Sequence, residues 1–278
     1  MPANNATGQQ NNTIHPVRAF GAYRMIYFSH PATRLFSPGE FLLVPFRKPF
    51  FMKAIVIVLT FLLFSLSTFS QSSKKTLPLT NAKGLRPHRV AVEAVTYEGK
   101  KSLRVVDTTK GISAETKYVL LPDIFFHNGT IEVELAGKPV AQSSGTARGF
   151  VGIAFRADSS NHNDFECFYL RPANGRAEDQ VRRNHSVQYI SHPDYPWERL
   201  RKETPEKYES YADLEVGKWT KVKIVVRDSA AKLYVNGAEQ PTLLVQDLKH
   251  GAARKGRIGL WIGPETEAYF RNLVVTTD

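Results

Sequence analysis

The chain has 278 residues, of which 42% are hydrophobic and 23% are charged. This composition excludes collagen-like, fully disordered and multi-span membrane proteins, and it indicates one or two globular domains. The single cysteine, Cys167, excludes an internal disulfide and any metal site built on several thiolates. Because free cysteines are usually buried, we expect Cys167 to be an inert core thiol.

The formal charge of +11, from 37 basic and 26 acidic residues, does not indicate a nucleic-acid-binding protein. The excess is spread along the chain and contains no run of five or six like charges. A nucleic-acid partner would also require a docking element or a dense basic stripe, and the sequence shows neither. We therefore expect no nucleic-acid partner.

Residues 52–70 have the order of a secretory signal peptide. Met52 and Lys53 precede an apolar run over 54–64, and small residues follow as far as Ser70. The competing interpretation is a membrane-spanning anchor, but an eleven-residue run is short for a hydrocarbon layer about 30 Å thick. We expect cleavage after Ser70, a secreted or periplasmic location and no stable membrane insertion afterwards.

The segments on either side of this signal give weaker patterns. Residues 1–51 show neither helical nor strand periodicity, so they are either not normally translated, with Met52 as the initiator, or a disordered extension. We expect residues 71–88 to be a linker. The domain proper is then predicted over residues 89–278.

Short β-rich segments separated by turn signals recur through the predicted domain. A helical turn is expected only within 197–211, where Pro205 would end it. Such a pattern predicts an all-β fold, either a sandwich or a barrel of antiparallel strands. The expected strands are 89–97, 102–106, 118–121, 129–135, 149–156, 165–171, 186–190, 219–226, 232–235, 257–262 and 268–275.

Alternation along these strands separates a core face from an outer face. The apolar alternating sets are predicted to be core: Val151, Ile153, Phe155, Val222, Ile224, Val226, Leu233, Val235, Ile258, Leu260 and Ile262. The opposite face is predicted to carry Arg156, Trp261, Tyr269 and Arg271, together with either Tyr169 and Arg171 or Glu166 and its alternating neighbours. Neighbouring strands would then gather arginines and aromatic rings on one outer sheet face.

Several of these segments resemble the concanavalin A-like lectin/glucanase superfamily. They are the stretch 217–226 around Trp219, the run from Leu233 to Gly237, the run from Gly256 to Trp261, and Tyr269 to Val274. The resemblance covers about residues 90–276 and is similar to the laminin G-like and 3-keto-disaccharide hydrolase-like members. It implies a jelly-roll β-sandwich of two antiparallel sheets. Trp261 departs from the glutamine that many hydrolase-like members have there, so the ligand face is expected to differ.

An outer face of arginine, tyrosine and tryptophan fits a carbohydrate ligand, because flat rings stack on sugar C–H faces and guanidinium groups hydrogen-bond to hydroxyls. Ordinary exposed strand residues of the same types are the alternative. The long connection from residue 173 to 211 is expected to fold over the sheet and shape the site. The candidate substrate-binding residues are Arg156, Tyr169, Arg171, Gln188, Tyr189, Trp197 and Trp261.

Catalysis is left open by the sequence. No glucanase signature E-x-D-x-x-E is present, whereas a keto-sugar route needs only one base and a group that polarises the ketone. Glu166, His185 and His192 are the candidate bases. Three hypotheses follow: an enzyme cleaving glycosidic bonds in keto-disaccharides or glycosides, a non-catalytic lectin-like module, and a laminin G-like interaction module.

The only cofactor that the sequence suggests is a divalent metal such as calcium. The segment from Asp158 to Asp164 is rich in oxygen ligands, but it lacks the carboxylate and glycine pattern of a dedicated calcium loop. A turn stabilised by Asn and Asp side chains is the favoured interpretation. The oligomeric state is not predicted.

Overall fold

The computed structural model describes residues 72–109 and 116–278. The predicted extension at 1–51 and the predicted signal peptide at 52–70 lie outside these residues. Across the described ranges, no helix is long and apolar enough to cross a membrane.

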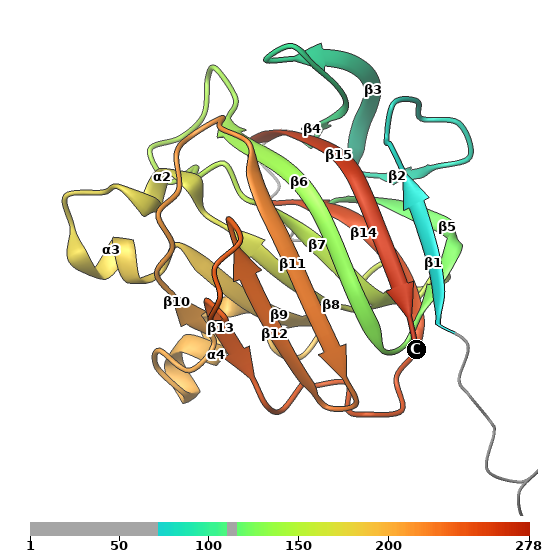
Figure 1. Ribbon diagram of the computed structural model, residues 1–278. Coiled ribbons are helices and arrows are strands. Elements are labelled where there is room, and N and C mark those ends of the chain that lie inside the picture. Colours follow the sequence, from blue (N-terminus) through green and yellow to red (C-terminus); the bar gives the residue numbers. More distant parts are fainter. Residues whose placement is uncertain (1–71, 110–115) are drawn as a thin grey trace, which may run out of the picture. The chain divides into compact units, whose positions relative to one another are not determined.

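The first of two antiparallel sheets has eight strands (Figure 1). β1 (Ser73–Leu77) pairs with β15 outside the main strand path. The main path runs β13 (Leu243–Val245), β12 (Ala230–Val235), β11 (Thr220–Arg227), β6 (Gly129–Pro139), β15 (Thr266–Thr277), β4 (Lys100–Asp107) and β3 (Val90–Tyr97).

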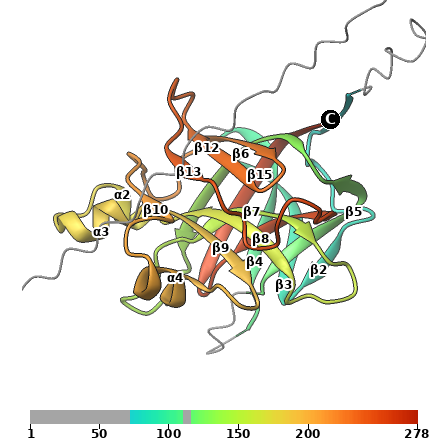
Figure 2. The same ribbon diagram turned by 90° about the horizontal axis from the view of Figure 1, so that it is seen from below.

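The second sheet has seven strands, and three short helices precede or follow its β9 strand. The helices are α2 (Pro172–Gly175), α3 (Gln180–Asn184) and α4 (Trp197–Glu203), and they lie on one side of the molecule near β9 and β10 (Figures 1 and 2). The strand order is β10 (Glu209–Ser210), β9 (Val187–His192), β8 (Phe165–Leu170), β7 (Val151–Ala157), β14 (Gly256–Ile262), β5 (Tyr118–Phe126) and β2 (Arg86–His88).

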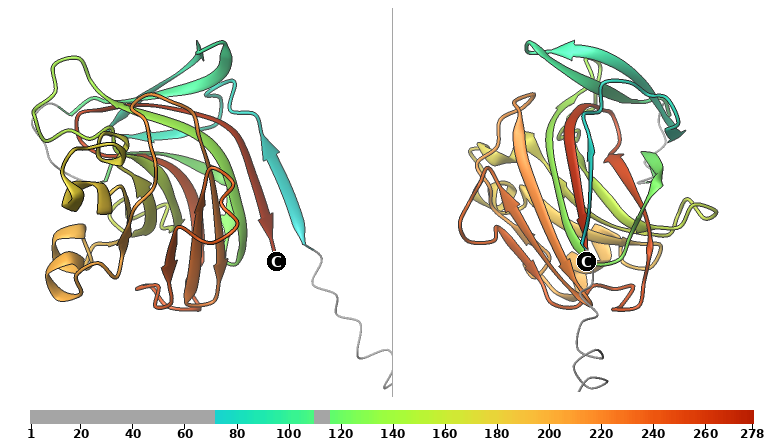
Figure 3. Two further views of the ribbon diagram at one scale, coloured as in Figure 1. Left: turned by 60° about the vertical axis from the view of Figure 1, so that its left-hand side comes forward. Right: turned by 45° about the vertical axis from the view of Figure 1, so that its right-hand side comes forward.

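The chain passes repeatedly between the two sheets. It leaves the seven-stranded sheet after β5, returns to it at β7, leaves again after β10, and crosses twice more at β14 and β15. Crossings of this kind between two curved antiparallel layers make a jelly-roll sandwich (Figure 3). The predicted all-β jelly-roll sandwich of two antiparallel sheets is therefore confirmed.

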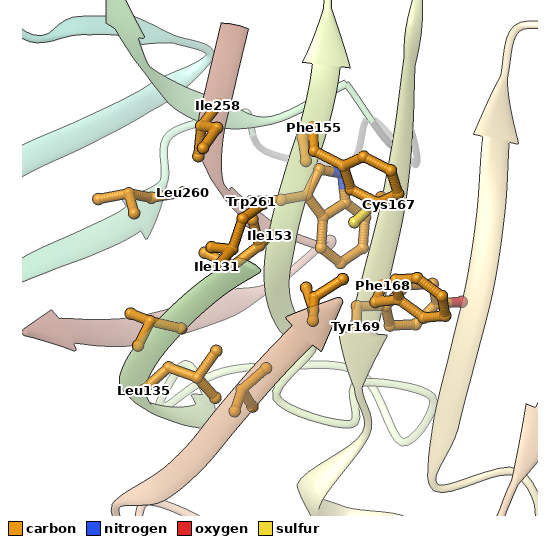
Figure 4. Close-up of a cluster of buried hydrophobic side chains, with 14 of the residues drawn as sticks. Ile131, Leu135, Ile153, Phe155, Cys167, Phe168, Tyr169, Ile258, Leu260 and Trp261 are labelled. Atoms are coloured by element: carbon orange, nitrogen blue, oxygen red, sulfur yellow. The ribbon is translucent and has the colours of Figure 1, made fainter. Parts of the chain in front are cut away.

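The core lies between the sheets and is built from the alternating apolar positions. Ile131 and Leu135 of β6 belong to the same buried cluster as Ile153, Phe155 and Phe168 of the facing sheet (Figure 4). Every residue predicted to be core is buried. Cys167 is buried, as expected.

The segment predicted to be a linker, 71–88, contains β1 and β2, which pair with β15 and β5. Prolines at 78 and 87 and the glycine at 84 interrupt its alternation, so the strand pattern is too short to recognise. β10 and β13, with two and three residues, are also too short to show an alternating pattern in the sequence. The expected helical turn is present as α4, which ends at Glu203, two residues before Pro205. The restriction of helix to 197–211 is wrong, because α2 and α3 also form, with four and five residues.

Candidate functional site

One row of side chains crosses the seven-stranded sheet on the face that points away from the core. Trp261 lies opposite Gly152, Gly152 opposite Tyr169, Tyr169 opposite Gln188, and Gln188 opposite Glu209. These residues alternate with the core positions of β14, β7, β8 and β9, so they share the other face. Five neighbouring strands thus bring residues that are far apart in the sequence into one line.

Gly152 leaves room in this row for two aromatic rings. The ring centroids of Tyr169 and Trp261 lie 4.7 Å apart with an interplanar angle of 34°. Phe150, just before β7, meets Tyr169 edge-on at 6.1 Å. Tyr169 and Trp261 are each only 1% exposed, so they form a packed floor rather than a free stacking surface.

A cavity of about 600 Å³ lies over this floor. Its lining includes the half-buried rings of Trp197 and Phe150, together with Arg171 and His185. Trp197 comes from α4 and His185 follows α3, so the long connection between β8 and β10 supplies one wall. The connection predicted to fold over the sheet does so only in part: β9 and β10 join the sheet, and the segments around α3 and α4 line the cavity.

Arg171 is held by the protein on both terminal nitrogens. Its Nη2 donates to the Tyr169 hydroxyl at 2.7 Å and to Gln188 Oε1 at 3.1 Å. Its Nη1 donates to the His185 carbonyl at 3.1 Å and to Glu209 Oε1 at 3.2 Å. Because these bonds occupy both terminal nitrogens, Arg171 is a rigid part of the cavity wall.

The carboxylate of Glu209 binds several basic side chains behind this wall. Arg201 Nε donates to Glu209 Oε2 at 2.9 Å, and Arg201 Nη2 makes a second bond to Oε1. His185 Nε2 lies 3.5 Å from Glu209 Oε2. The guanidinium of Arg201 also lies 4.6 Å from the centre of the Trp197 ring, and that of Arg171 lies 5.7 Å from it. Trp197 is therefore oriented by two cations that share one carboxylate.

The environment sets the charge of both titratable partners. Burial opposes the charge on Glu209, but the hydrogen bond from Arg201 and the charges of Arg171 and Arg201 outweigh it and hold the pKa of this carboxyl below its ordinary value. Burial lowers the pKa of His185 even though Glu209 acts in the opposite direction. At pH 7 the carboxylate is ionised and the imidazole is neutral.

The structure brings together Tyr169, Arg171, His185, Trp197 and Trp261 in the lining of this cavity. Gln188 lies directly behind it: this side chain is fully buried, accepts from Arg171 and donates to the carbonyl of Tyr189 at 2.9 Å. Six of the predicted site residues thus belong to one arrangement.

Arg156 lies elsewhere, contrary to the expectation that it shares a face with Trp261. The pairing of β7 with β14 shifts register between Arg257 and Gly259, and Arg156 has a left-handed φ of 52° at this bulge. The bulge turns the side chain toward Glu166, and Nη1 lies 3.4 Å from Glu166 Oε2. Strict alternation fails here because the bulge adds one residue to β7.

Glu166 and Tyr189 share this second arrangement, on the core side of the sheet. The Tyr189 hydroxyl donates to Glu166 Oε1 at 2.9 Å and accepts from the backbone N–H of Lys249 at 2.9 Å. Arg156 and Glu166 side chains are 0% exposed. None of the three residues lines the cavity.

His192 and the oxygen-rich loop also lie away from the cavity lining. His192 stacks on Phe165 at 4.9 Å, at the end of β9 remote from Gln188. Asp158 Oδ1 accepts from the N–H of Ser160 at 2.8 Å and from that of Asn161 at 3.3 Å, which makes the loop an Asx-type turn. No group of three or more His, Cys, Asp or Glu side chains among residues 72–109 and 116–278 has the geometry to hold a metal ion.

Several residues at the cavity are not among the candidate site residues predicted from the sequence. Arg148, Arg182, Glu198 and Glu265 line it, and Glu209 anchors its wall. Arg182 and Glu198 fall within the connection predicted to shape the site. Arg148 and Glu265 sit in turns outside the predicted strands, where no periodic signal marks a side chain as facing a ligand.

No family model and no curated protein matches this sequence. Among solved structures, it is similar to carbohydrate-binding module CBM66 from Bacillus subtilis, at 14% identity and a TM-score of 0.44 over 69% of this chain and 95% of that one. It is similar to a Bacillus subtilis protein of unknown function with a galectin-like fold, at 14% identity and a TM-score of 0.43 over 73% and 96%. Peanut lectin aligns at 11% identity and a TM-score of 0.40 over 74% and 97%. Because the identities are this low, only the chemistry of the cavity can point to its ligand.

Proposed function

We propose that this protein binds a carbohydrate in the cavity over Tyr169 and Trp261. The observation that carries the proposal is the lining itself, in which the half-buried rings of Trp197 and Phe150 stand beside arginine, histidine and carboxylate side chains. A pyranose presents apolar C–H faces to rings and hydroxyls to polar groups, and this lining offers both. A cavity of about 600 Å³ is of the size that ordinary small-ligand sites have.

The test compares two tryptophans that differ in their relation to the cavity. Trp197 lines it, whereas Trp219 lies outside its lining, half-buried, with Lys100 and Arg271 near its ring. Ligands would first be identified on a glycan array and then titrated by calorimetry. Loss of one aromatic contact is worth about 0.5–1.5 kcal/mol, so Trp197→Ala should weaken binding about 2- to 10-fold and Trp219→Ala should leave it unchanged.

Equal effects of the two substitutions would contradict a site at this cavity. Absence of binding by the wild-type chain to every glycan on the array would contradict the carbohydrate proposal itself.

Cleavage of a keto-sugar is the second candidate, favoured by His185 in the cavity wall. Its lowered pKa keeps the ring neutral, and with Nε2–H directed at Glu209 the Nδ1 lone pair can take a proton. Removal of the C–H proton beside a ketone would give an enolate. The enolate would then re-form the ketone and make a C=C bond between the α- and β-carbons while the glycosidic oxygen leaves the β-carbon. The leaving oxygen would take the proton that His185 had accepted, giving an unsaturated keto-sugar and a free alcohol.

Release of a product distinguishes a keto-sugar-cleaving enzyme from a lectin that only binds. Keto-modified and ordinary disaccharides would be incubated with the protein, with and without EDTA, and the products followed by chromatography. His185→Gln should abolish turnover and retain binding, whereas His192→Gln, outside the cavity lining, should keep turnover per folded molecule. Binding without any product from the keto-disaccharide would leave the lectin-like function alone.

A further inference from the structure

Four arginines line the cavity, and they fall into two kinds. Arg171 and Arg201 share Glu209 behind the wall. Arg148, which precedes β7, and Arg182, in α3, belong to the other kind. Among the ion pairs within the described residues, neither Arg148 nor Arg182 has a carboxylate partner.

Arg148 is half-buried and uses only part of its hydrogen-bonding capacity within the protein. Its Nη1 donates to the carbonyls of Gly145 at 2.7 Å and Ala147 at 3.0 Å. For Nη2 and Nε, residues 72–109 and 116–278 provide no hydrogen-bond acceptor. A guanidinium has five N–H donors in a planar fork, so this one keeps donors available on the side of the cavity.

Two of the three carboxylates in the cavity lining are already engaged, and the third, Glu198, is exposed on α4. Glu265 Oε2 accepts from the backbone N–H of Ser144 at 3.0 Å and from the Ser144 hydroxyl. Asp107 Oδ2 accepts from the backbone N–H of Glu265 at 2.9 Å and lies 3.9 Å from the buried Nζ of Lys117. These two acids stabilise their own loops and the buried lysine.

Arg148 also experiences the repulsion expected of an unpaired guanidinium. Burial lowers its pKa, and the positive charges of Arg182 and Arg171 lower it further. An anion entering the cavity would relieve this repulsion and supply the acceptors that Arg148 lacks.

We infer that the saccharide bound in this cavity is an acidic one, whose carboxylate or sulfate group is held by Arg148 and Arg182. The inference rests on the proposed carbohydrate-binding function and narrows it to a class of ligand. A neutral sugar would leave the two guanidiniums without a counter-charge, whereas an acidic sugar pairs its anion with the fork of Arg148.

The experiment uses pairs of oligosaccharides that differ only in charge. The full chain would be titrated calorimetrically with oligogalacturonate and its methyl ester, and with sulfated and unsulfated forms of one neutral oligosaccharide. A charge-assisted contact should make one acidic form bind about tenfold more tightly than its neutral partner. The preference should shrink at about 1 M NaCl, where the Debye length is about 3 Å. The uronate and sulfate arms distinguish the two sources of negative charge.

Variants place the preference at the two arginines. Arg148→Gln and Arg182→Gln should each reduce the acidic-to-neutral ratio, because the acidic form loses more affinity than the neutral form. Arg227→Gln is the control, because Arg227 is 68% exposed, pairs with Asp278 and is outside the cavity lining. This variant should keep the wild-type ratio.

The outcomes separate the inference from the function on which it rests. Saccharides that bind in a Trp197-dependent manner with no preference for the acidic form would overturn the inference and retain the proposed function. A preference that survives in both Arg148→Gln and Arg182→Gln would also overturn it. If no saccharide of either charge binds the wild-type chain, the proposed function falls and the inference falls with it.

Discussion

Two arginine–glutamate pairs lie at opposite ends of β8, and they serve different purposes. Arg156 and Glu166 meet on the core side, where both side chains are 0% exposed. Arg171 and Glu209 meet on the other side, where the arginine lines a cavity and Arg201 and His185 share the carboxylate. Both pairs join an arginine to a glutamate. The face of the sheet on which each pair lies decides whether a ligand can reach it.

The hydrogen bonds of the Arg156 pair are all made within the protein. Its guanidinium donates to the carbonyls of His127, Gly251 and Asp228 and to Asn128 Oδ1, at distances from 2.7 to 3.2 Å. It therefore ties three loops to β7, with no donor directed toward the cavity. The hydrogen-bonding groups of the Arg171 pair are also fully used within the protein. This pair lies next to Arg148 and Arg182, which keep hydrogen-bond donors without an acceptor in the described part of the chain. A ligand site can be recognised by unsatisfied groups beside a rigid wall.

Removal of Arg156 should produce the largest loss of stability. In Arg156→Leu the buried Glu166 carboxylate keeps the Tyr189 hydroxyl but loses its counter-charge. Breaking a buried pair in this way costs about 3–5 kcal/mol. Urea denaturation would measure the loss, and saccharide affinity per folded molecule should be unchanged.

The exposed Arg227→Gln variant is the matched control and should change the free energy of unfolding by less than about 0.5 kcal/mol. A large loss of affinity in folded Arg156→Leu would instead connect the core pair to the ligand and remove the contrast between the two ends of β8.

Gly152→Ala tests the floor of the cavity and should have the next largest effect. A Cβ at Gly152 would lie 2.2 Å from the carbonyl oxygen of Phe168 and 2.6 Å from Cα of Tyr169, so the backbone of β8 would have to move. Overpacking of this kind costs about 1–3 kcal/mol. Displacement of Tyr169 should also weaken saccharide binding.

Gly145 offers a control for this substitution, because a Cβ there meets nothing within 4 Å. Thermal unfolding of Gly145→Ala should match that of the wild type. Wild-type stability and affinity in Gly152→Ala would show that the row across β14, β7 and β8 tolerates a side chain.

Much of the sandwich could be predicted from sequence because its long strands alternate cleanly. β11 and β14 place every second residue in the core, and each has a turn signal nearby. β2 and β10 could not be predicted, since they have three and two residues and are specified by pairing with β5 and β9 rather than by a pattern of their own.

The candidate site was predictable only in part. Tyr169, Arg171 and Trp261 follow from alternation on regular strands, which is why the structure brings them together. Arg156 does not, because a bulge at a left-handed φ reverses the direction of its side chain. Arg148 and Glu209 depend on how a turn and a two-residue strand are placed, and that information lies in tertiary contacts.

Acidification should weaken the cavity wall through Glu209. The pKa of this carboxyl is lower in the folded chain than its ordinary value of 4.5. Its stabilising contribution is therefore fully present above about pH 4.5 and is lost as the pH falls through the lower native value. The difference in unfolding free energy between wild type and Glu209→Gln should be largest at pH 7 and shrink toward pH 3.

Urea titrations at several pH values would measure this difference. Glu203→Gln removes an exposed carboxylate paired with Arg199 on α4, and it should change the free energy of unfolding at pH 7 by less than about 1 kcal/mol. A Glu209→Gln difference that stays constant down to pH 3 would mean that the carboxylate charge does not hold the wall.

The last comparison removes one hydroxyl at each end of β8, and the smallest effect is expected at the Arg171 end. Tyr189→Phe deletes the donor to Glu166 and the acceptor for Lys249 N–H in a sealed core, and a hydrogen bond to a buried charge is worth about 1.5–3 kcal/mol. Tyr169→Phe deletes the acceptor of Arg171 beside the cavity. Water in the cavity can replace that acceptor, so the loss should stay below about 1 kcal/mol. Unfolding free energies from urea denaturation would decide: equal losses would mean that the Arg171 end is as sealed as the Arg156 end, and no ligand could then reach its wall.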